Sequence, residues 1–260
     1  MLPVLRLLSA EVWRVWLNFR RYPNEAFASM TSFTILFYAV VMGAQGATAG
    51  PLALGSGLEA LIVSFVLWYL AVIGLGSMAW GIQTEAQVGT LEQLWLTPHG
   101  LWRVLVARVA AFATLQLVLT GILLAAMLLL TGRRLFVPPE SLLAALPFLL
   151  GVNGLGFVLA GLAVTYKNIV GTINLAQYLV ILLIAVPPKA WPAALQPAYH
   201  LFPLVPAAEV LRQLMAQGVP LPETPWAAAA ANGLTYFALG LLFYRWAERR
   251  VRRSGKLSGY

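Results

Sequence analysis

The residues best suited to chemistry form a polar insert between two long apolar segments, at positions 85–98, which read EAQVGTLEQLWLTP. Leu91, Leu94 and Trp95 recur there at helical spacing, and Glu85 and Glu92 are interspersed among them. Apolar anchors beside a few charges suit binding to another protein, in which the carboxylates meet basic groups. The same pattern also fits a helix resting on lipid, and the spacing alone does not separate these two interpretations.

Bond-making chemistry has no comparable pattern in this sequence. A phosphate-binding GxxxxGK[ST] loop is missing, and the one Gly-Lys pair, Gly255-Lys256, lacks the preceding glycine. His99 and His200 stand alone near prolines, and the chain has no cysteine, so a metal site or a general base has no support. We therefore expect no enzymatic activity, no metal and no cofactor in this chain.

The elements around the insert are predicted to be membrane-spanning helices. Of 260 residues, 60% are hydrophobic and only 10% are charged, whereas a soluble domain is about 25% charged. Six segments approach the roughly 20 residues that a helix needs to cross a bilayer, the fifth being the shortest. They are Phe27–Gly46, Ala60–Ile82, Val109–Leu130, Leu142–Thr165, Ile169–Val186 and Trp226–Tyr244. The predicted fold is an all-α polytopic membrane protein with six transmembrane helices.

The interiors of these six segments contain no Asp, Glu, Lys, Arg or His. Proton- or sodium-coupled carriers usually place ionisable groups inside the membrane, so this absence disfavours that class. The buried polar candidates are neutral: Gln116, Asn153, Asn174 and Gln177. We favour hydrogen bonds between helices as their role, with a substrate path as the alternative.

The charge distribution predicts the topology. The net charge is +8, and most of the 17 Lys and Arg fall on one side of the predicted bilayer, in the N-terminal segment, the inner loops and the C-terminal tail. Arg133, Arg134, Lys189 and Arg212 make up the smaller set on the other side. The positive-inside rule places both termini in the cytoplasm. The basic excess therefore reflects membrane topology, and we expect no nucleic-acid partner.

Two further segments have distinct patterns. Residues 4–22 are predicted to form an amphipathic interface helix, because Val12, Val15, Trp16 and Phe19 share a face opposite a polar one that includes Glu11 and Arg14. Such a helix is a plain anchor or, alternatively, a lever for a cytoplasmic partner. Residues 187–225 hold nine prolines around a short predicted helix at 207–217. This outer stretch either dips into the membrane or forms an extracellular loop.

At the insert, the sequence resembles the ABC-2 class of ABC transporter permeases. The resemblance rests on Glu85, the Gly89-Thr90-Leu91-Glu92 core and the closing Thr97-Pro98. The order of six segments after an amphipathic helix agrees, as does the stretch Phe202-Pro203-Leu204 followed by Glu209-Val210-Leu211-Arg212. Two positions depart from the common family pattern. Ala86 replaces a basic residue, and Ala107-Arg108 stands where Gly-Lys is frequent.

The resemblance implies that residues 84–97 form a cytoplasmic coupling helix that docks on a separate ABC ATPase. Its implied contact residues are Glu85, Gly89, Thr90, Leu91, Glu92, Leu94 and Trp95. Residues 198–217, with Pro203, Glu209 and Arg212, are implied to form an extracellular gate. The whole chain, 1–260, is then one ABC-2 type transmembrane domain. ATP and Mg would be bound by the ATPase.

The function implied is export of an amphiphilic drug-like or lipid molecule across a prokaryotic plasma (inner) membrane. Two ATPase copies and a second permease, identical or related, are the implied partners. Export of a lipid-linked polysaccharide is the alternative within the same class of machine. A passive channel or a membrane scaffold is the alternative from outside it, although no recurring polar stripe suggests a pore.

Overall fold

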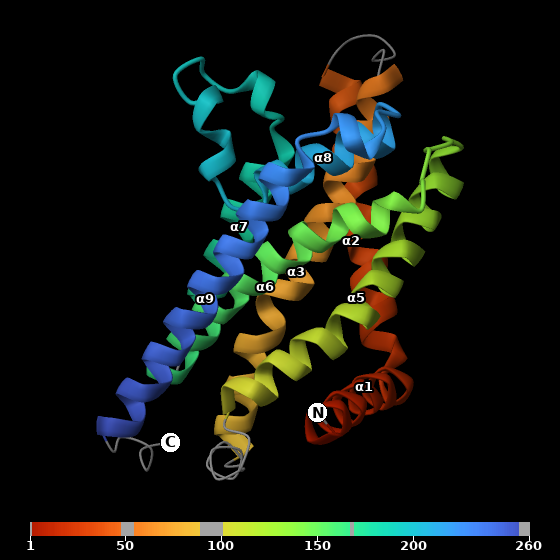
Figure 1. The fold of residues 1–260 in the computed structure, drawn as a ribbon. Helices are drawn as coiled ribbons and strands as arrows, with labels where there is room; N and C mark the ends of the chain where they lie inside the picture. The colour runs from red at the N-terminus through yellow and green to blue at the C-terminus, as the bar shows by residue number, and fades with distance from the viewer. Residues whose placement is uncertain (1, 48–54, 89–100, 167–168, 255–260) are drawn as a thin grey trace.

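The computed structural model describes residues 2–47, 55–88, 101–166 and 169–254, and all regular elements in these ranges are helices. Five of them are long and apolar enough to cross a membrane. The α-helices are α1 (Leu2–Arg21), α2 (Pro23–Ala47), α3 (Gly55–Val88), α5 (Leu101–Thr131), α6 (Glu140–Thr165), α7 (Val170–Ala185), α8 (Val205–Ala216) and α9 (Trp226–Ser254). Figure 1 shows them as one bundle with the start of α1 and the end of α9 at the same pole.

The predicted fifth span corresponds to α7, which is shorter than the other apolar helices. Its 16 residues reach about 24 Å at 1.5 Å per residue, against about 30 Å of hydrocarbon. Pro187 and Pro188 follow the helix, and proline inside a helix removes a backbone donor, which accounts for its early end. Of the six predicted spans, five therefore have a helix of full spanning length.

α3 and α6 form the centre of the bundle, and α2, α5 and α9 surround them. In α3 and α6, 67% of the most apolar window is buried, whereas the corresponding share in α2 is 17%. Large apolar side chains such as Ile35, Leu129 and Leu242 remain exposed on the surrounding helices. A membrane protein presents such surface to lipid or to another membrane subunit.

Glycines bring α6 and α9 into backbone contact. A Cβ added at Gly233 would meet the carbonyl of Pro147, and one added at Gly240 would meet the carbonyl of Gly154. A Cβ at Gly154 would in turn meet the backbone of Tyr236. Small residues at such crossings let membrane helices approach closely and gain van der Waals contact. This packing makes α6 and α9 a single unit.

Two of the four neutral polar residues in the predicted spans join helices. Gln116 of α5 donates from Nε2 to the Leu70 carbonyl of α3 at 2.6 Å. Gln177 of α7 donates to the Val72 carbonyl of the same helix at 3.2 Å. Asn153 bonds the Leu149 carbonyl within α6, and Asn174 is exposed. The predicted hydrogen bonding between helices is therefore confirmed for Gln116 and Gln177.

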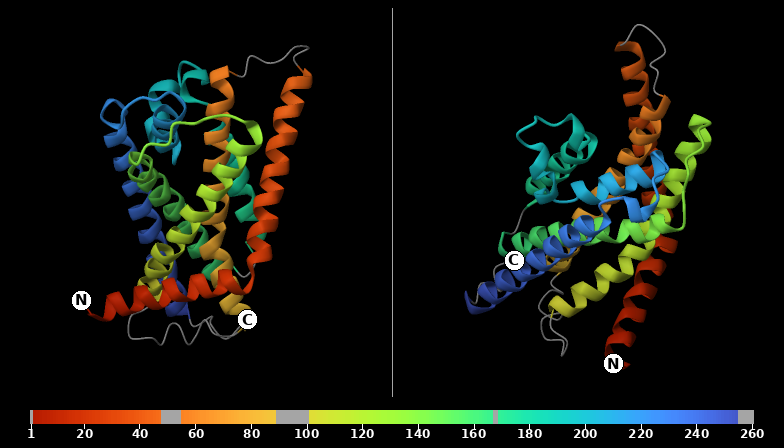
Figure 2. Two further views of the ribbon diagram at one scale, coloured as in Figure 1. Left: turned by 90° about the vertical axis from the view of Figure 1, so that its right-hand side faces the viewer. Right: turned by 45° about the horizontal axis from the view of Figure 1, so that its top comes forward.

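α1 lies across one end of the bundle, and α2 rises from it (Figure 2). Following the predicted topology, we label this end the inner end and the opposite end the outer end. The predicted boundaries of this amphipathic helix, 4–22, agree closely with Leu2–Arg21, and α2 begins at Pro23. Proline suits the first turn of a helix because its missing N–H would have no helical partner there. Val15, Trp16 and Phe19 of α1 pack against the bundle, so this face is covered partly by protein.

Two helices continue well past the predicted C-terminal ends of their spans, and α5 begins at Leu101, eight residues before the predicted start at Val109. α3 continues to Val88, so Thr84 and Glu85 belong to its last turns and do not begin a separate element. α9 continues through its basic segment to Ser254, well past the predicted span end at Tyr244. Arg and Glu favour helix as strongly as many apolar residues, and neither extension contains proline. Apolar length locates a span, whereas helix ends depend on breakers.

The proline-rich outer stretch folds into short helices, namely η1 (Pro188–Ala190), η2 (Gln196–Leu201), α8 and η3 (Leu221–Glu223). α8 confirms the helix predicted at 207–217. It packs on α3, α6 and α9, and its residues from Val205 to Arg212 are buried. α8 is therefore inserted between helix ends, where protein covers it, whereas residues 192–201 of the same stretch are mostly exposed.

Candidate functional site

Four charged residues meet at the inner end of the bundle, where α1, α3 and α5 come together. Arg108 of α5 lies at the centre, with Nη2 3.3 Å from Glu85 Oε1 and Nε 3.6 Å from Glu11 Oε2. Arg14 of α1 lies 3.8 Å from the same Glu85 oxygen and 3.9 Å from Glu11. We call this set, Glu11, Arg14, Glu85 and Arg108, the inner charge cluster.

The cluster is unevenly exposed. The side chains of Glu11, Arg108 and Glu85 are 9%, 12% and 18% exposed, whereas that of Arg14 is 55% exposed. Partly buried carboxylates without partners lose much of their hydration, so removal of Arg108 would be costly. An exposed pair contributes little to stability, so Arg14 matters less for the fold. Arg108 is thus the structural centre of the cluster.

This arrangement differs from the expected position of Glu11. The sequence places it on the polar face of a membrane-surface helix, open to solvent, yet it is buried against Arg108. The reason is charge pairing between helices, which a hydrophobic pattern does not report. In the sequence, Arg108 stands out as one of the basic residues predicted on the inner side and as a departure from the family pattern at 107–108. One feature of the sequence could have indicated this ion pair: Glu11 is an acidic residue in a helix whose other charged residues are arginines.

Glu85 is the one predicted coupling residue whose side chain lies among the described residues. Its carboxylate contacts Arg14 and Arg108 of this same chain. The remaining predicted contact residues, Gly89, Thr90, Leu91, Glu92, Leu94 and Trp95, lie outside the described residues. The predicted role of the insert therefore stays a prediction, with Glu85 engaged within the chain.

A second charged pair lies at the outer end, on α8. Arg212 Nη2 is 3.1 Å from Glu209 Oε2, and the two side chains are 4% and 8% exposed. Arg212 Nη1 also donates to the Ile184 carbonyl at 2.8 Å and to Ser64 Oγ at 3.3 Å. Burial lowers the pKa of the Arg212 guanidinium, and the neighbouring Glu209 carboxylate raises that pKa in opposition. The arginine therefore links α8 to α3 and α7.

The start of α8 is strained. Leu204, directly after the predicted gate residue Pro203, has a φ of 68° and is buried. A leucine in this left-handed region is uncommon and costs about 1–3 kcal/mol. Its side chain occupies the space beside Gly151 of α6, where an added Cβ would lie 2.7 Å from Leu204 Cδ2. The predicted gate residues Pro203, Glu209 and Arg212 thus lie on one short segment.

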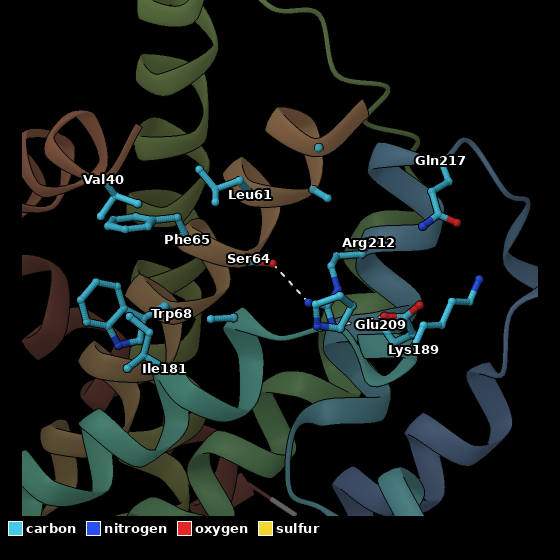
Figure 3. Close-up of a pocket in the computed structure, with 14 residues that line it drawn as sticks. Val40, Leu61, Ser64, Phe65, Trp68, Ile181, Lys189, Glu209, Arg212 and Gln217 are labelled. Atoms are coloured by element: carbon cyan, nitrogen blue, oxygen red, sulfur yellow. Dashed lines mark hydrogen bonds and ion pairs between the residues drawn. The ribbon is translucent and has the colours of Figure 1, made fainter. Parts of the chain in front are cut away.

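Each charged set borders a cavity. The inner cavity, of about 630 Å³, includes Arg14 and Arg108 with apolar residues of α3 and α5. The outer cavity, of about 480 Å³, includes Glu209 and Arg212 with residues of α2, α3 and α7 (Figure 3). Ligand sites commonly fall in this size range. Within the described residues, no group of three His, Asp or Glu side chains is arranged to hold a metal ion.

Comparison with known proteins gives one family. The profile of the family described as ABC-2 type transporter matches residues 6–216, which is more than half of the chain. The matched region begins in α1, ends with α8, and contains both charged sets. No curated protein matches the sequence.

Proposed function

Because this chain belongs to the ABC-2 type transporter family, we propose that it is the membrane subunit of an exporter that moves an amphiphilic, drug-like or lipid molecule outward. Energy comes from ATP bound with Mg on a separate ATPase subunit. Two ATPases and a second permease, identical or related, complete the machine. The family match over residues 6–216 is the observation that carries the proposal.

The inner charge cluster supports a route for the motion. α1 and the end of α3 are both tied to Arg108, so a displacement of either one acts on α5. The insert at 89–97 lies between α3 and α5 in the chain and carries the motif that would dock on the ATPase. We assign docking to this insert and transmission to the cluster. The lever role of α1 follows from the same contacts.

The proposed orientation places the inner charge cluster in the cytoplasm. The start of α1 and the end of α9 lie at this pole (Figure 1), together with the arginines of α1 and of the final turns of α9. The positive-inside rule supports this orientation. The opposite pole then carries α8, and the segment 198–217 acts as part of an extracellular gate.

The proposal is tested by capture of the ATPase. The protein is purified in mild detergent together with the ABC ATPase encoded beside it, in wild-type form and as the double variant Glu92→Arg, Leu94→Asp. We expect the wild type to retain the ATPase and the variant to lose it, because the changes reverse a charge and remove an apolar anchor.

The matched control makes the same chemical changes at the opposite pole. Glu223 and Leu201 are both exposed there, so Glu223→Arg, Leu201→Asp should retain the ATPase. Both variants must elute as folded protein during gel filtration. If the insert variant binds as well as the wild type, docking through the insert is wrong. If the wild type itself captures no ATPase, the proposed machine is wrong.

A further inference from the structure

The outer cavity has two ends of different chemistry. Its apolar end is formed by Val40 of α2, Phe65 and Trp68 of α3, and Ile181 of α7. Its polar end is formed by Glu209 and Arg212 of α8 with Lys189 of η1. Figure 3 shows the two groups on opposite sides of the cavity. A molecule that fills this space must therefore have an apolar body and a polar head.

The unused binding capacity at the polar end is cationic. Glu209 Oε1 accepts from Gln213 Nε2 at 2.9 Å, and Oε2 lies 3.1 Å from Arg212 Nη2 in an ion pair that is not a hydrogen bond. Arg212 Nε is buried and donates no hydrogen bond within the described part of the chain. Lys189 is exposed and forms no ion pair with any residue that the structure describes. Within the described residues the donors without acceptors thus belong to Lys189 and Arg212, whereas the Glu209 carboxylate has no proton to donate and is already ion-paired with Arg212.

We propose that the outer cavity binds amphiphiles with an anionic head group, a phosphate or a carboxylate, held by Lys189 and Arg212. This inference rests on the proposed export function and names the substrate class. A volume of about 480 Å³ suits one drug-sized or single-chain molecule. The head group accepts hydrogen bonds from Lys189 and from the Arg212 guanidinium, and the alkyl chain of the ligand lies against Phe65 and Trp68. Charge-assisted hydrogen bonds of this kind are the stronger ones.

Trp68 allows binding to be measured on this chain alone. The protein is placed in phosphatidylcholine nanodiscs and titrated with a single-chain alkyl phosphate that is brominated along its chain. Bromine quenches indole fluorescence at short range. The part of the quenching that is lost in Trp68→Phe therefore measures binding in the outer cavity. We expect saturable quenching of Trp68 by the alkyl phosphate. A brominated alkyl ammonium of equal chain length should have a half-saturating concentration at least about tenfold higher, because it cannot accept charge-assisted hydrogen bonds from the two cations.

Three variants test the head-group contacts. Lys189→Gln removes an exposed cation and should raise the half-saturating concentration about tenfold, the value of one charge-assisted bond. Glu209→Gln, Arg212→Gln removes both buried charges together, so neither is left unpaired, and should weaken binding similarly. Arg133→Gln removes an exposed arginine from the 132–139 loop, outside the cavity lining, and should leave binding unchanged.

Further probes distinguish a membrane lipid from a single-chain amphiphile as the source of the head group. Brominated phosphatidylglycerol, with two chains, tests a membrane lipid against the single-chain probe, and saturable quenching by either supports the anionic site. Equal or tighter binding of the alkyl ammonium overturns the proposal. So does an unchanged affinity in Lys189→Gln, or no quenching specific to Trp68. Because no ATPase takes part, failure here is distinguishable from failure of the export proposal.

Discussion

Arg108 Nη2 lies 3.3 Å from Glu85 Oε1, and these two residues flank the segment that carries the predicted docking motif. Glu85 belongs to the last turns of α3, and Arg108 to the first turns of α5. The ion pair therefore joins the two ends of the intervening segment. Arg108 also contacts Glu11, so α1 is connected to the same ion pair. Under the proposed docking, a force applied to the insert would act on this ion pair.

Replacing Arg108 should destabilise the inner end of the bundle. Arg108→Gln leaves the mostly buried Glu11 and Glu85 carboxylates with only Arg14 as a cationic partner in the cluster, and we expect a loss of about 1–3 kcal/mol. The measurement is the thermal unfolding midpoint in detergent. Arg20→Gln, at an exposed position of α1, is the matched control and should change little. Equal midpoints for the two variants would mean that the cluster contributes nothing to the fold.

Substitution at Gly240 should prevent normal assembly of α6 and α9. In Gly240→Ala the methyl group meets the Gly154 carbonyl, and both groups belong to helix backbones that cannot move independently. We expect a strong loss of monodisperse protein in fluorescence-detected gel filtration. Gly121→Ala is the control, because an added Cβ there has no neighbour within 4 Å. A normal profile for Gly240→Ala would refute the close contact.

Loss of the Gln116 side chain should loosen the contact between α3 and α5. Gln116→Leu keeps the size of the residue roughly constant and removes its donor to the Leu70 carbonyl. Hydrogen bonds between membrane helices contribute about 0.6–2 kcal/mol, so a modest fall in the unfolding midpoint is expected. Thr114→Val, which removes only a bond within α5 to Ala111, should have a smaller effect. A larger fall in the unfolding midpoint for Thr114→Val than for Gln116→Leu would argue against the hydrogen bond between the helices.

Cysteine labelling can decide whether α7 crosses the membrane. The chain has no cysteine, so Tyr166→Cys and Ala193→Cys each introduce a single exposed thiol, one at either end of α7. We expect an impermeant maleimide to label position 193 in intact spheroplasts and position 166 only after permeabilisation. Labelling of both from the same side would reduce the spans to the five helices of full length.

The sequence predicted the elements of this fold better than their contacts. Apolar length and proline positions located α1, α2 and α8 to within a few residues, because these features act locally. The junction of Glu11 with Arg108 was not predicted, since it joins residues far apart in the chain whose types fit a solvated surface equally well. Gln116 and Gln177 illustrate the same limit. Their polarity indicated a bond between helices, whereas only the fold identifies α3 as the acceptor.

The contact set of the outer cavity was also inaccessible to sequence patterns. Glu209 and Arg212 were indicated by the family motif, but Lys189 and Ser64 belong to other elements. Neither of the latter two lies in a motif. Lys189 and Ser64 come close to α8 because α8 packs between α3, α6 and α9. The proline content of the stretch did not predict this packing, since it fitted a segment that dips into the membrane and an extracellular loop equally well.

The junction between α1 and α2 has a mechanical consequence. A single residue, Tyr22, separates the helices, and its amide donates to the Asn18 carbonyl at 3.0 Å. Pro23 fixes its own φ and restricts the residue before it, so the corner has few soft torsions. α1 is about 30 Å long. A 3 Å shift of its N-terminal end would therefore rotate the helix by about 6° about the corner. Through a corner this stiff, such a rotation would tilt α2, as the proposed lever role of α1 requires.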